Sequence, residues 1–324
     1  MSPPLLDIRD LSVTYQASGG GLTAVRGVNL TVAAGETVGV AGESGCGKST
    51  LASTVLRLQA RTATVTGQVQ VDGHDVLTMS WGDLRAVRWA GASIVFQGAL
   101  HSLNPVLRVG DQIREPIRLH DPSVSANQLG ERVEELFEQV GMPPSRERMY
   151  PHQLSGGQRQ RVMIAMALAC RPRLVIADEP TTALDVMVQA QVLGVLTDLV
   201  SDLGVGLMLI SHDLSVLATT CDRIVVMYAG RVVEEGPAAE VFTGASHPYA
   251  MALAAAFPRV GDQAARYAPA GLPGDPPDPH DLPGGCSFRP RCPRAIDACA
   301  DAEPPLLQIG RGRSAACIRV EVPA

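Results

Sequence analysis

The sequence lacks three features that would each define a class of protein. It has no excess of positive charge, because 27 Lys and Arg face 33 Asp and Glu, so nothing suggests a nucleic-acid binder. It has no uninterrupted apolar run of about 18 residues, which a membrane-spanning helix needs. Its first ten residues lack the charged and then apolar pattern of a signal peptide. We therefore expect a globular protein that stays in the cytosol and does not bind nucleic acid.

Cysteine is scarce in most of the chain and clustered near its end. Four of the seven cysteines follow the spacing C-x5-C-x6-C-x17-C, namely Cys286, Cys292, Cys299 and Cys317. In a cytosolic chain such a cluster indicates metal ligation before disulfides. Neighbouring arginines would favour the thiolate form; they are Arg289, Arg291, Arg294, Arg311 and Arg313. Four thiolates suit Zn²⁺ or an iron–sulfur cluster, although paired C-x2-C motifs are absent; free or disulfide-forming thiols are the third alternative.

Short apolar segments predict an α/β fold. Segments rich in β-branched residues near the start favour an antiparallel β layer; they are Leu5–Tyr15, Val28–Val32 and Gly67–Val71. From Glu36 onward, apolar runs alternate with helix-length segments, which indicates a parallel sheet covered by helices. These runs are Thr37–Val40, Leu174–Ala177, Leu207–Ile210 and Arg223–Met227.

Two further features predict how the chain is divided. The segment Gln128–Val140 places apolar residues on one helical face, so we expect an amphipathic helix inside a helical subdomain at about 98–165. After Phe257 the sequence becomes rich in Pro and Gly, which is typical of a linker. We therefore predict a large domain over residues 1–257 and a Pro-rich linker with a Cys-rich extension over residues 258–324.

A glycine-rich segment directly follows the first strand of the predicted parallel sheet. Residues 42–50 match the phosphate-binding pattern G-x-x-x-x-G-K-[ST] and lead into a predicted helix. We expect the loop amides to bind phosphate, Lys48 to bridge the β- and γ-phosphates of ATP, and Ser49 to ligate Mg²⁺. A glycine-rich turn with a chance Lys-Ser pair is the alternative, which this context disfavours. The predicted phosphate site comprises Gly42, Ser44, Gly45, Cys46, Gly47, Lys48, Ser49 and Thr50; Cys46 is interpreted as a small residue rather than a redox switch.

Polar residues follow two later strands of the predicted sheet. Asp178 and Glu179 come at the end of one strand, and His212 follows another. Since ligands bind at the carboxyl ends of parallel strands, we expect Asp178 to hold Mg²⁺ and Glu179 to polarise the attacking water. Alone, each pattern is more often an exposed turn or a structural histidine, but their order behind the phosphate loop favours catalysis.

Residues 154–161 read Leu-Ser-Gly-Gly-Gln-Arg-Gln-Arg and resemble the signature sequence of ABC-transporter ATPases. The resemblance covers nearly all of residues 5–257, because Tyr15 matches the adenine-stacking aromatic and Gln97 the glutamine of the Q-loop. The segment Thr182-Ala183-Leu184-Asp185 matches the D-loop. The resemblance implies a phosphate-loop ATPase domain with a parallel sheet core, an antiparallel β subdomain and a helical subdomain.

The same resemblance implies how the site works. In this family two chains sandwich two ATP molecules head to tail, and the signature of one chain grips the γ-phosphate held by the other. Gln97 would join Mg²⁺ and water to the helical subdomain, and His212 would contact the γ-phosphate. The signature and D-loop residues in the nucleotide set are Ser155, Gly156, Gly157, Gln158 and Asp185. All these groups are intact, so we expect hydrolysis.

The end of the chain resembles the C-terminal extension of oligopeptide and dipeptide importer ATPases. The matching segments are His247-Pro248-Tyr249, Gly274-Asp275-Pro276-Pro277 and residues 285–293, which begin Gly-Cys-Ser-Phe. The segment Gln97-Gly98-Ala99 departs from the family, whose members commonly carry Asp-Pro after the glutamine. Nickel and oligosaccharide importers therefore stay open as alternatives. The resemblance also favours a four-iron, four-sulfur (4Fe-4S) cluster at the four clustered cysteines.

The resemblance implies partners and a location. We expect a second, homologous ATPase chain, two transmembrane permease subunits and an extracytoplasmic solute-binding protein, with this chain peripheral at the cytoplasmic face of the cell membrane. Non-transport ABC ATPases are disfavoured, since chromosome-acting members carry long coiled coils and ribosome-acting members usually carry two ATPase halves. Exporters commonly fuse membrane helices to the ATPase, so import is favoured over export.

Overall fold

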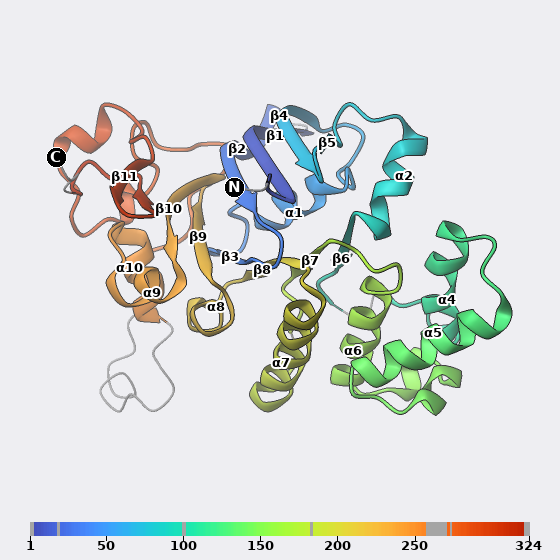
Figure 1. Ribbon diagram of the computed structural model, residues 1–324. Coiled ribbons are helices and arrows are strands. Elements are labelled where there is room, and N and C mark those ends of the chain that lie inside the picture. Colours follow the sequence, from blue (N-terminus) through green and yellow to red (C-terminus); the bar gives the residue numbers. More distant parts are fainter. Residues whose placement is uncertain are drawn as a thin grey trace. The chain divides into compact units, whose positions relative to one another are not determined.

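The computed structural model describes residues 3–17, 20–98, 102–181, 184–256, 271–272 and 274–320. The chain divides into two compact units, and Figure 1 labels many of its helices and strands. Unit 1 comprises Met1–Leu6, Val32–Glu36 and Gln70–Met208, and unit 2 comprises Asp7–Thr31, Thr37–Val69 and Leu209–Ala324. The domain boundary predicted near residue 258 falls outside the described residues and stays a prediction.

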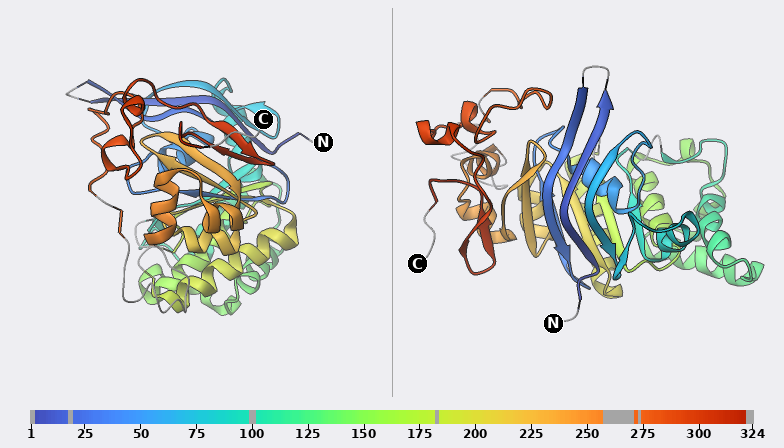
Figure 2. Two further views of the ribbon diagram at one scale, coloured as in Figure 1. Left: turned by 90° about the vertical axis from the view of Figure 1, so that its left-hand side faces the viewer. Right: turned by 90° about the horizontal axis from the view of Figure 1, so that it is seen from above.

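Unit 2 contains the predicted β layer. The strands β1 (Leu6–Ala17) and β2 (Gly20–Val32) are hydrogen-bonded neighbours, and β4 (Thr64–Val71) flanks β1. Figure 2 shows β1 and β2 running side by side over most of their length. The alternation of buried and exposed residues at the end of β2 matches a sheet with one face in the core. These strands confirm the three segments predicted from β-branched residues.

A second sheet in unit 2 carries the phosphate loop. Its strand β3 (Thr37–Ala41) pairs in parallel with β9 (Arg223–Tyr228), and β9 pairs antiparallel with β10 (Arg231–Pro237). Two short strands of the extension, β12 (Arg313–Ala315) and β11 (Leu307–Gly310), continue this sheet beyond β10. The C-terminal extension is therefore joined to the preceding segment by strand pairing.

Short helices complete unit 2. The helix α9 packs against β10 and α10, and α8 packs against β3. An aromatic cluster holds the extension, because the Phe288 ring centroid lies 5.2 Å from that of Tyr228 and 5.4 Å from that of Tyr249. The helices are α1 (Lys48–Val55), α8 (Leu214–Thr220), α9 (Ala238–Gly244), α10 (Pro248–Ala256), η3 (Arg289–Arg291) and η4 (Asp297–Ala300).

Unit 1 combines parallel strands with a group of helices. The strands β6 (Ala92–Val95) and β7 (Leu174–Asp178) pair in parallel, which confirms the predicted sheet type. The helix α5 (Ala126–Gln139) confirms the predicted amphipathic helix, since it buries Leu129, Val133, Leu136 and Phe137. The other elements are β5 (His74–Asp75), α2 (Trp81–Ala90), α4 (Val109–His120), η1 (Pro144–Arg148), η2 (Pro151–Gln153), α6 (Gly156–Ala167), α7 (Val186–Leu203) and β8 (Gly206–Ser211), which runs on into unit 2.

One described helix, α7, is long and apolar enough to cross a membrane by length and composition alone. The expectation from uninterrupted apolar runs did not single it out, because Asp198 and Asp202 interrupt its sequence. Its buried residues are Val192, Leu193, Leu196 and Val200, whose spacing marks one helical face. A single such helix is weak grounds for a membrane span.

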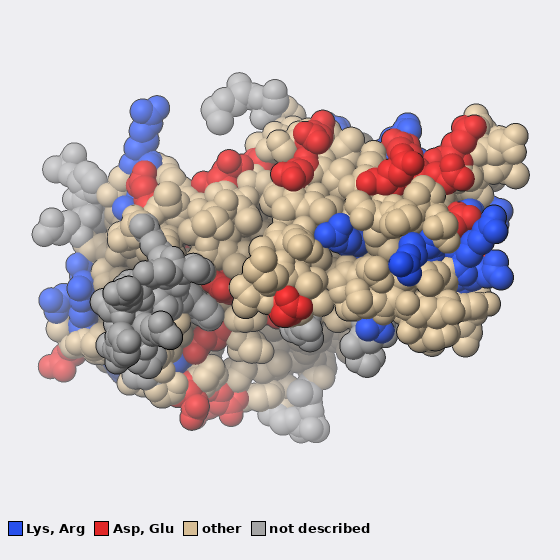
Figure 3. All heavy atoms as spheres, turned by 90° about the horizontal axis from the view of Figure 1, so that it is seen from below, with Lys and Arg blue, Asp and Glu red and all other residues tan. Residues whose placement is uncertain are grey.

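Charge is mixed on the face drawn in Figure 3. Acidic and basic side chains both occur there, with uncharged surface between them. This distribution agrees with the small net charge of −6.

Candidate nucleotide-binding site

The phosphate loop of unit 2 lies between β3 and α1, as predicted. Gly42, Gly45 and Gly47 have φ values of 153°, 80° and 104°, in the region that L side chains rarely adopt. At Gly47 an added Cβ would lie 2.2 Å from the carbonyl oxygen of Ala24. Backbone conformation therefore favours all three glycines, and Gly47 is also required by its close packing against β2.

Lys48 begins α1 and is bound to the carbonyls of its own loop. Its Nζ donates to the oxygen of Gly42 at 2.7 Å and to that of Glu43 at 2.8 Å. The residue is 4% exposed, so the two carbonyls supply acceptors that a buried ammonium needs. This arrangement holds a positive charge inside the loop, where a phosphate would bind.

Cys46 fits its interpretation as a small buried residue of the loop. It is 6% exposed, and burial raises the pKa of its thiol despite the opposing charge of Lys48. A raised pKa keeps the thiol protonated and poorly reactive. Ser44, Gly45 and Ser49 are exposed, so the loop presents these residues to solvent.

Two further predicted residues lie in unit 2. Tyr15 is a half-buried residue of β1, and His212 is exposed after β8. The following residue, Asp213, caps α8 by accepting hydrogen bonds from the backbone nitrogens of Ser215 and Val216. The cap fixes where β8 ends and the helix begins, and so fixes the turn that carries His212.

Unit 1 brings the predicted glutamine and carboxylate together. The Gln97 Nε2 donates to the Glu179 Oε2 at 2.9 Å. Glu179 has a φ of 43°, a strained conformation for a non-glycine residue that is concentrated at functional sites. Asp178 is buried at the end of β7. Asp178 and Glu179 thus come at the end of a strand, as predicted, whereas the strand β6 that precedes Gln97 was not predicted.

The signature residues of unit 1 start α6. The Ser155 Oγ accepts from the Gln158 backbone nitrogen, and the Gln158 Oε1 accepts from the Ser155 nitrogen, which forms a capping box. An added Cβ on Gly157 would lie 2.5 Å from the Val188 Cγ1, and one on Gly156 would lie 3.1 Å from a Leu184 methyl. The glycines thus allow α6 to start close to the residues that start α7.

The predicted D-loop is described only in part. Asp185 caps α7 by accepting from the Val188 nitrogen at 3.0 Å, and its side chain is exposed. Thr182 and Ala183 lie outside the described residues, as does Ala99 after the Q-loop glutamine. The roles expected of these segments stay predictions.

The four clustered cysteines lie near one another in unit 2. The Cys286 backbone nitrogen donates to the Cys299 oxygen at 2.8 Å. Burial raises the pKa of the Cys286 thiol, and so do the nearby thiols of Cys299, Cys317 and Cys292. However, no group of three or more His, Cys, Asp or Glu side chains among the described residues is arranged to hold a metal ion.

Two of the five arginines expected to favour thiolates pair with carboxylates instead. Arg291 pairs with Glu43 and Arg313 with Glu234, while the pKa values of Cys286 and Cys317 are raised, chiefly by burial. The expectation of lowered thiol pKa values is therefore wrong for these two cysteines. Burial outweighs the charge of the nearby Arg319 at Cys317.

Sequence reasoning missed three residues that hold the phosphate loop. Glu43 was counted only as a variable loop position, yet its carboxylate binds Arg291 and its backbone nitrogen donates to the Tyr249 hydroxyl at 2.8 Å. The only sequence signal was that Tyr249 and Arg291 fall within matching segments of the extension.

These features define a class of protein. A glycine loop with a buried lysine between a strand and a helix, together with a carboxylate pair after another parallel strand, is the arrangement of the phosphate-loop nucleotide hydrolases.

Comparisons with known proteins place the chain within that class. The family described as "ABC transporter" matches residues 25–182, and "Oligopeptide/dipeptide transporter, C-terminal region" matches residues 233–299. The oligopeptide transport ATP-binding protein OppD of Salmonella typhimurium is 45% identical over 97% of this chain and 93% of its own length. Its Escherichia coli counterpart is 44% identical with the same coverage.

Solved structures agree with this placement. The dimeric post-hydrolysis ATP-binding cassette MJ0796 bound to ADP and Pi has a TM-score of 0.65 and 29% identity, covering 72% of this chain and 98% of its own. The cbiO1 structure from Clostridium perfringens has a TM-score of 0.64 and 27% identity, covering 75% of this chain and 92% of its own. The chain belongs to the ABC-transporter ATPases, in the family of oligopeptide and dipeptide transport ATP-binding subunits, and it is an ATPase.

Proposed function

We propose that this chain is the ATP-hydrolysing subunit of an importer of di- and oligopeptides. The observation that carries the proposal is similarity to oligopeptide transport ATP-binding proteins over nearly the whole chain, extension included. The chain would work at the cytoplasmic face of the cell membrane with a second, homologous ATPase chain, two permease subunits and an extracytoplasmic solute-binding protein.

The described residues support a separate role for each group at the nucleotide. The loop amides and Lys48 bind the phosphates, and Tyr15 stacks on adenine. Ser49, Gln97 and Asp178 offer the oxygen donors that Mg²⁺ prefers, and the ion would neutralise phosphate charge when bound. His212 contacts the γ-phosphate. The residues Ser155, Gly156, Gly157, Gln158 and Asp185 serve the nucleotide of the opposite subunit.

Glu179 is the proposed group that polarises the attacking water. Its hydrogen bond from Gln97 orients the carboxylate, and a carboxylate is the type of group that polarises water. Gln97 follows β6 and precedes the helices α4 and α5. It would therefore link the state of the carboxylate to the helical subdomain, which would transmit movement to the permease.

The role of Glu179 is tested by Glu179→Gln. Because an amide cannot accept a proton from water, ATP hydrolysis should fall at least about 100-fold while ATP binding persists. Glu134→Gln is the matched control, since Glu134 is an exposed carboxylate on α5. Steady-state hydrolysis and equilibrium ATP binding are measured for both. Unchanged hydrolysis in Glu179→Gln would remove the assigned role.

The peptide cargo is tested on the native membrane complex. We expect the solute-binding protein that copurifies with this chain to carry di- or oligopeptides, which mass spectrometry identifies. A nickel complex or an oligosaccharide in that protein would refute peptide import and leave the ATPase assignment intact.

We also propose that Cys286, Cys292, Cys299 and Cys317 hold a 4Fe-4S cluster with a structural role. The proximity of four thiols supports this proposal, since Cys₄ sets suit such clusters. The donor type and neighbourhood fit the group, whereas ligating geometry is not formed among the described residues. When bound, the cluster would cross-link an extension whose segments 274–288 and 292–306 contain no described strand.

Metal analysis after anaerobic purification tests the cluster. We expect about four iron and four sulfide per chain, with visible absorption. Cys299→Ser should lose both, whereas Cys170→Ser, which alters an isolated cysteine, should keep them. Stoichiometric zinc, or no metal, would refute the cluster.

A further inference from the structure

The phosphate loop of unit 2 is held from outside by the C-terminal extension. The Arg291 guanidinium donates to both carboxylate oxygens of Glu43, from Nη1 to Oε2 at 2.7 Å and from Nη2 to Oε1 at 3.0 Å. Such a bidentate ion pair is strong and directional. It joins residues that are 248 positions apart in the sequence.

Every polar group of Glu43 is engaged. Its backbone nitrogen donates to the Tyr249 hydroxyl, and its carbonyl accepts from Lys48 at 2.8 Å. The Cys46 backbone nitrogen also donates to this carbonyl, at 3.3 Å. Two of the four partners, Tyr249 and Arg291, come from the segments that resemble the extension of peptide-importer ATPases. Glu43 is therefore the residue through which Tyr249 and Arg291 contact the phosphate loop.

Arg291 is itself fixed in place. Its side chain is 6% exposed, and its Nη2 also donates to the Gly274 carbonyl at 3.1 Å. Its guanidinium carbon lies 5.9 Å from the ring centroids of both Tyr228 and Phe288, where cation–π attraction acts. An arginine held by packing loses little further freedom when it pairs. The pair is thus better ordered than an exposed ion pair.

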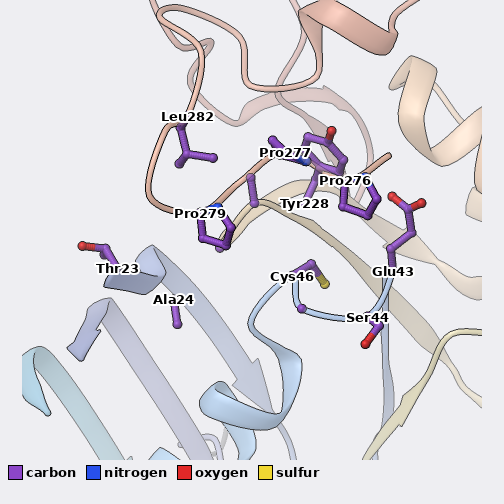
Figure 4. Close-up of a pocket in the computed structure, with 13 residues that line it drawn as sticks. Thr23, Ala24, Glu43, Ser44, Cys46, Tyr228, Pro276, Pro277, Pro279 and Leu282 are labelled. Carbon is purple, nitrogen blue, oxygen red and sulfur yellow. The ribbon is translucent and has the colours of Figure 1, made fainter. Parts of the chain in front are cut away.

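The extension and the phosphate loop line the same cavity next to this pair. Ser44, Gly45 and Cys46 line one side of it, and the other side is formed by Pro276, Pro277, Pro279 and Leu282. In the close-up, the proline segment faces Cys46 and Ser44 across the cavity (Figure 4). Proline restricts the backbone of this segment, so the wall opposite the loop is stiff.

We propose that Arg291 is a positioning residue for ATP binding, and that the extension sets the loop's affinity for ATP by holding Glu43. The loop needs such a hold, because its three glycines at positive φ allow many conformations in the absence of outside contacts. Fixing Glu43 fixes the adjacent amides that bind phosphate and lowers the entropy lost on binding. Arg291 acts through Glu43 and has no contact with the nucleotide in this role.

The test compares full-length variants by equilibrium binding of Mg-ATP and by the KM and kcat of hydrolysis. Arg291→Gln should raise Kd and KM about fivefold to tenfold and change kcat less than about twofold, because the loop binds substrate and transition state alike. Arg291→Lys keeps the positive charge but cannot form the bidentate pair with Glu43. Its Kd should therefore lie between those of the wild type and Arg291→Gln.

A double-mutant cycle isolates the pair. Glu43→Gln should match Arg291→Gln, and the double variant should be no weaker in ATP binding than either single variant. Fully additive losses of affinity would overturn the proposal, because they would mean that each residue acts independently of the other.

Arg313→Gln is the matched control. Arg313 belongs to the same extension and pairs with the buried Glu234, so its loss should lower the Tm and leave KM within about twofold of the wild type. An equal rise in KM in Arg313→Gln would overturn the proposal, since general destabilisation would then explain the effect. An unchanged KM in folded Arg291→Gln would also overturn it. Should Arg291→Gln fail to fold, an unchanged KM in both Arg291→Lys and Glu43→Gln decides against the proposal.

Discussion

At the scale of single residues, burial shifts the pKa of several groups in unit 2, among them His247 and Glu234. His247 is 2% exposed, and burial lowers the pKa of its imidazole to about 4. The neutral ring is useful there, because its Nδ1 accepts from the Tyr249 backbone nitrogen at 3.1 Å. Charged groups at this segment include Glu234, whose carboxylate accepts from the His247 backbone nitrogen, and Arg313, which pairs with Glu234. Arg231 and Glu303 line the same cavity as His247.

His247 makes stability depend on pH. Since its folded pKa of about 4 lies below its unfolded value, its contribution is complete above the unfolded pKa of about 6.5 and is lost as pH falls. Between pH 7 and pH 5 the loss should be about 2 kcal/mol of unfolding free energy. Denaturant titrations at both pH values measure it in the wild type and in His247→Gln, which should lack this component.

Glu234 and an exposed histidine complete that test. Burial raises the pKa of Glu234, so its contribution has the opposite sign and falls as pH rises through its folded pKa. The difference between the wild type and His247→Gln therefore isolates the histidine. His280→Gln, at an exposed position, should retain the wild-type pH dependence; an identical dependence in His247→Gln would disprove the assignment.

At the scale of elements, two capping boxes in unit 1 offer a comparison between structure and function. Ser125 with Gln128 caps α5, and Ser155 with Gln158 caps α6 in the same way. Ser155→Ala and Ser125→Ala should each cost about 1 kcal/mol of stability, because each helix loses an N-cap acceptor. Only Ser155→Ala should lower ATP hydrolysis, by at least about tenfold. Thermal unfolding measures the change in stability, and hydrolysis rates measure the change in activity. A similar loss of hydrolysis in Ser125→Ala would mean that Ser155 acts only as a helix N-cap.

Element prediction succeeded where the signal is local. Runs of apolar residues predicted β3, β7, β8 and β9 correctly, because the sequence pattern of a buried strand is carried by consecutive residues. The strands β11 and β12 have no such run and form by pairing with each other and with β10. Their formation depends on contacts that periodicity does not report.

The same distinction holds for the site. The phosphate loop, the carboxylates and the capped signature each occupy a few consecutive residues, so their patterns were readable. The Glu43–Arg291 pair and the raised pKa of the clustered thiols arise only after distant segments fold together. Local chemistry was therefore predictable, and the connection between the extension and the loop was not.

At the scale of the whole molecule, the extension supplies part of the core of unit 2. Phe288 is 1% exposed among the rings of Tyr228, Tyr249 and His247. Arg313 compensates the fully buried Glu234, and β12 covers the edge of β10. Ending the chain after Ala256 would leave a buried carboxylate without its arginine and an open strand edge.

Truncation after Ala256 should therefore give an unstable, self-associating protein. Size-exclusion chromatography and thermal unfolding measure this outcome. Phe288→Ala in the full chain is the milder companion and should cost about 3 kcal/mol, because it leaves a cavity in the aromatic cluster. A monodisperse truncated protein with the wild-type Tm would contradict a structural role for the extension.

The distance in sequence between Glu43 and Arg291 has a consequence for biosynthesis. Translation adds Glu43 248 residues before it adds the arginine that binds it. Every nascent chain that ends before Arg291 has a phosphate loop that lacks the contact with this arginine. Full affinity for ATP is thus acquired only near the end of synthesis, so that unfinished chains compete poorly for the nucleotide.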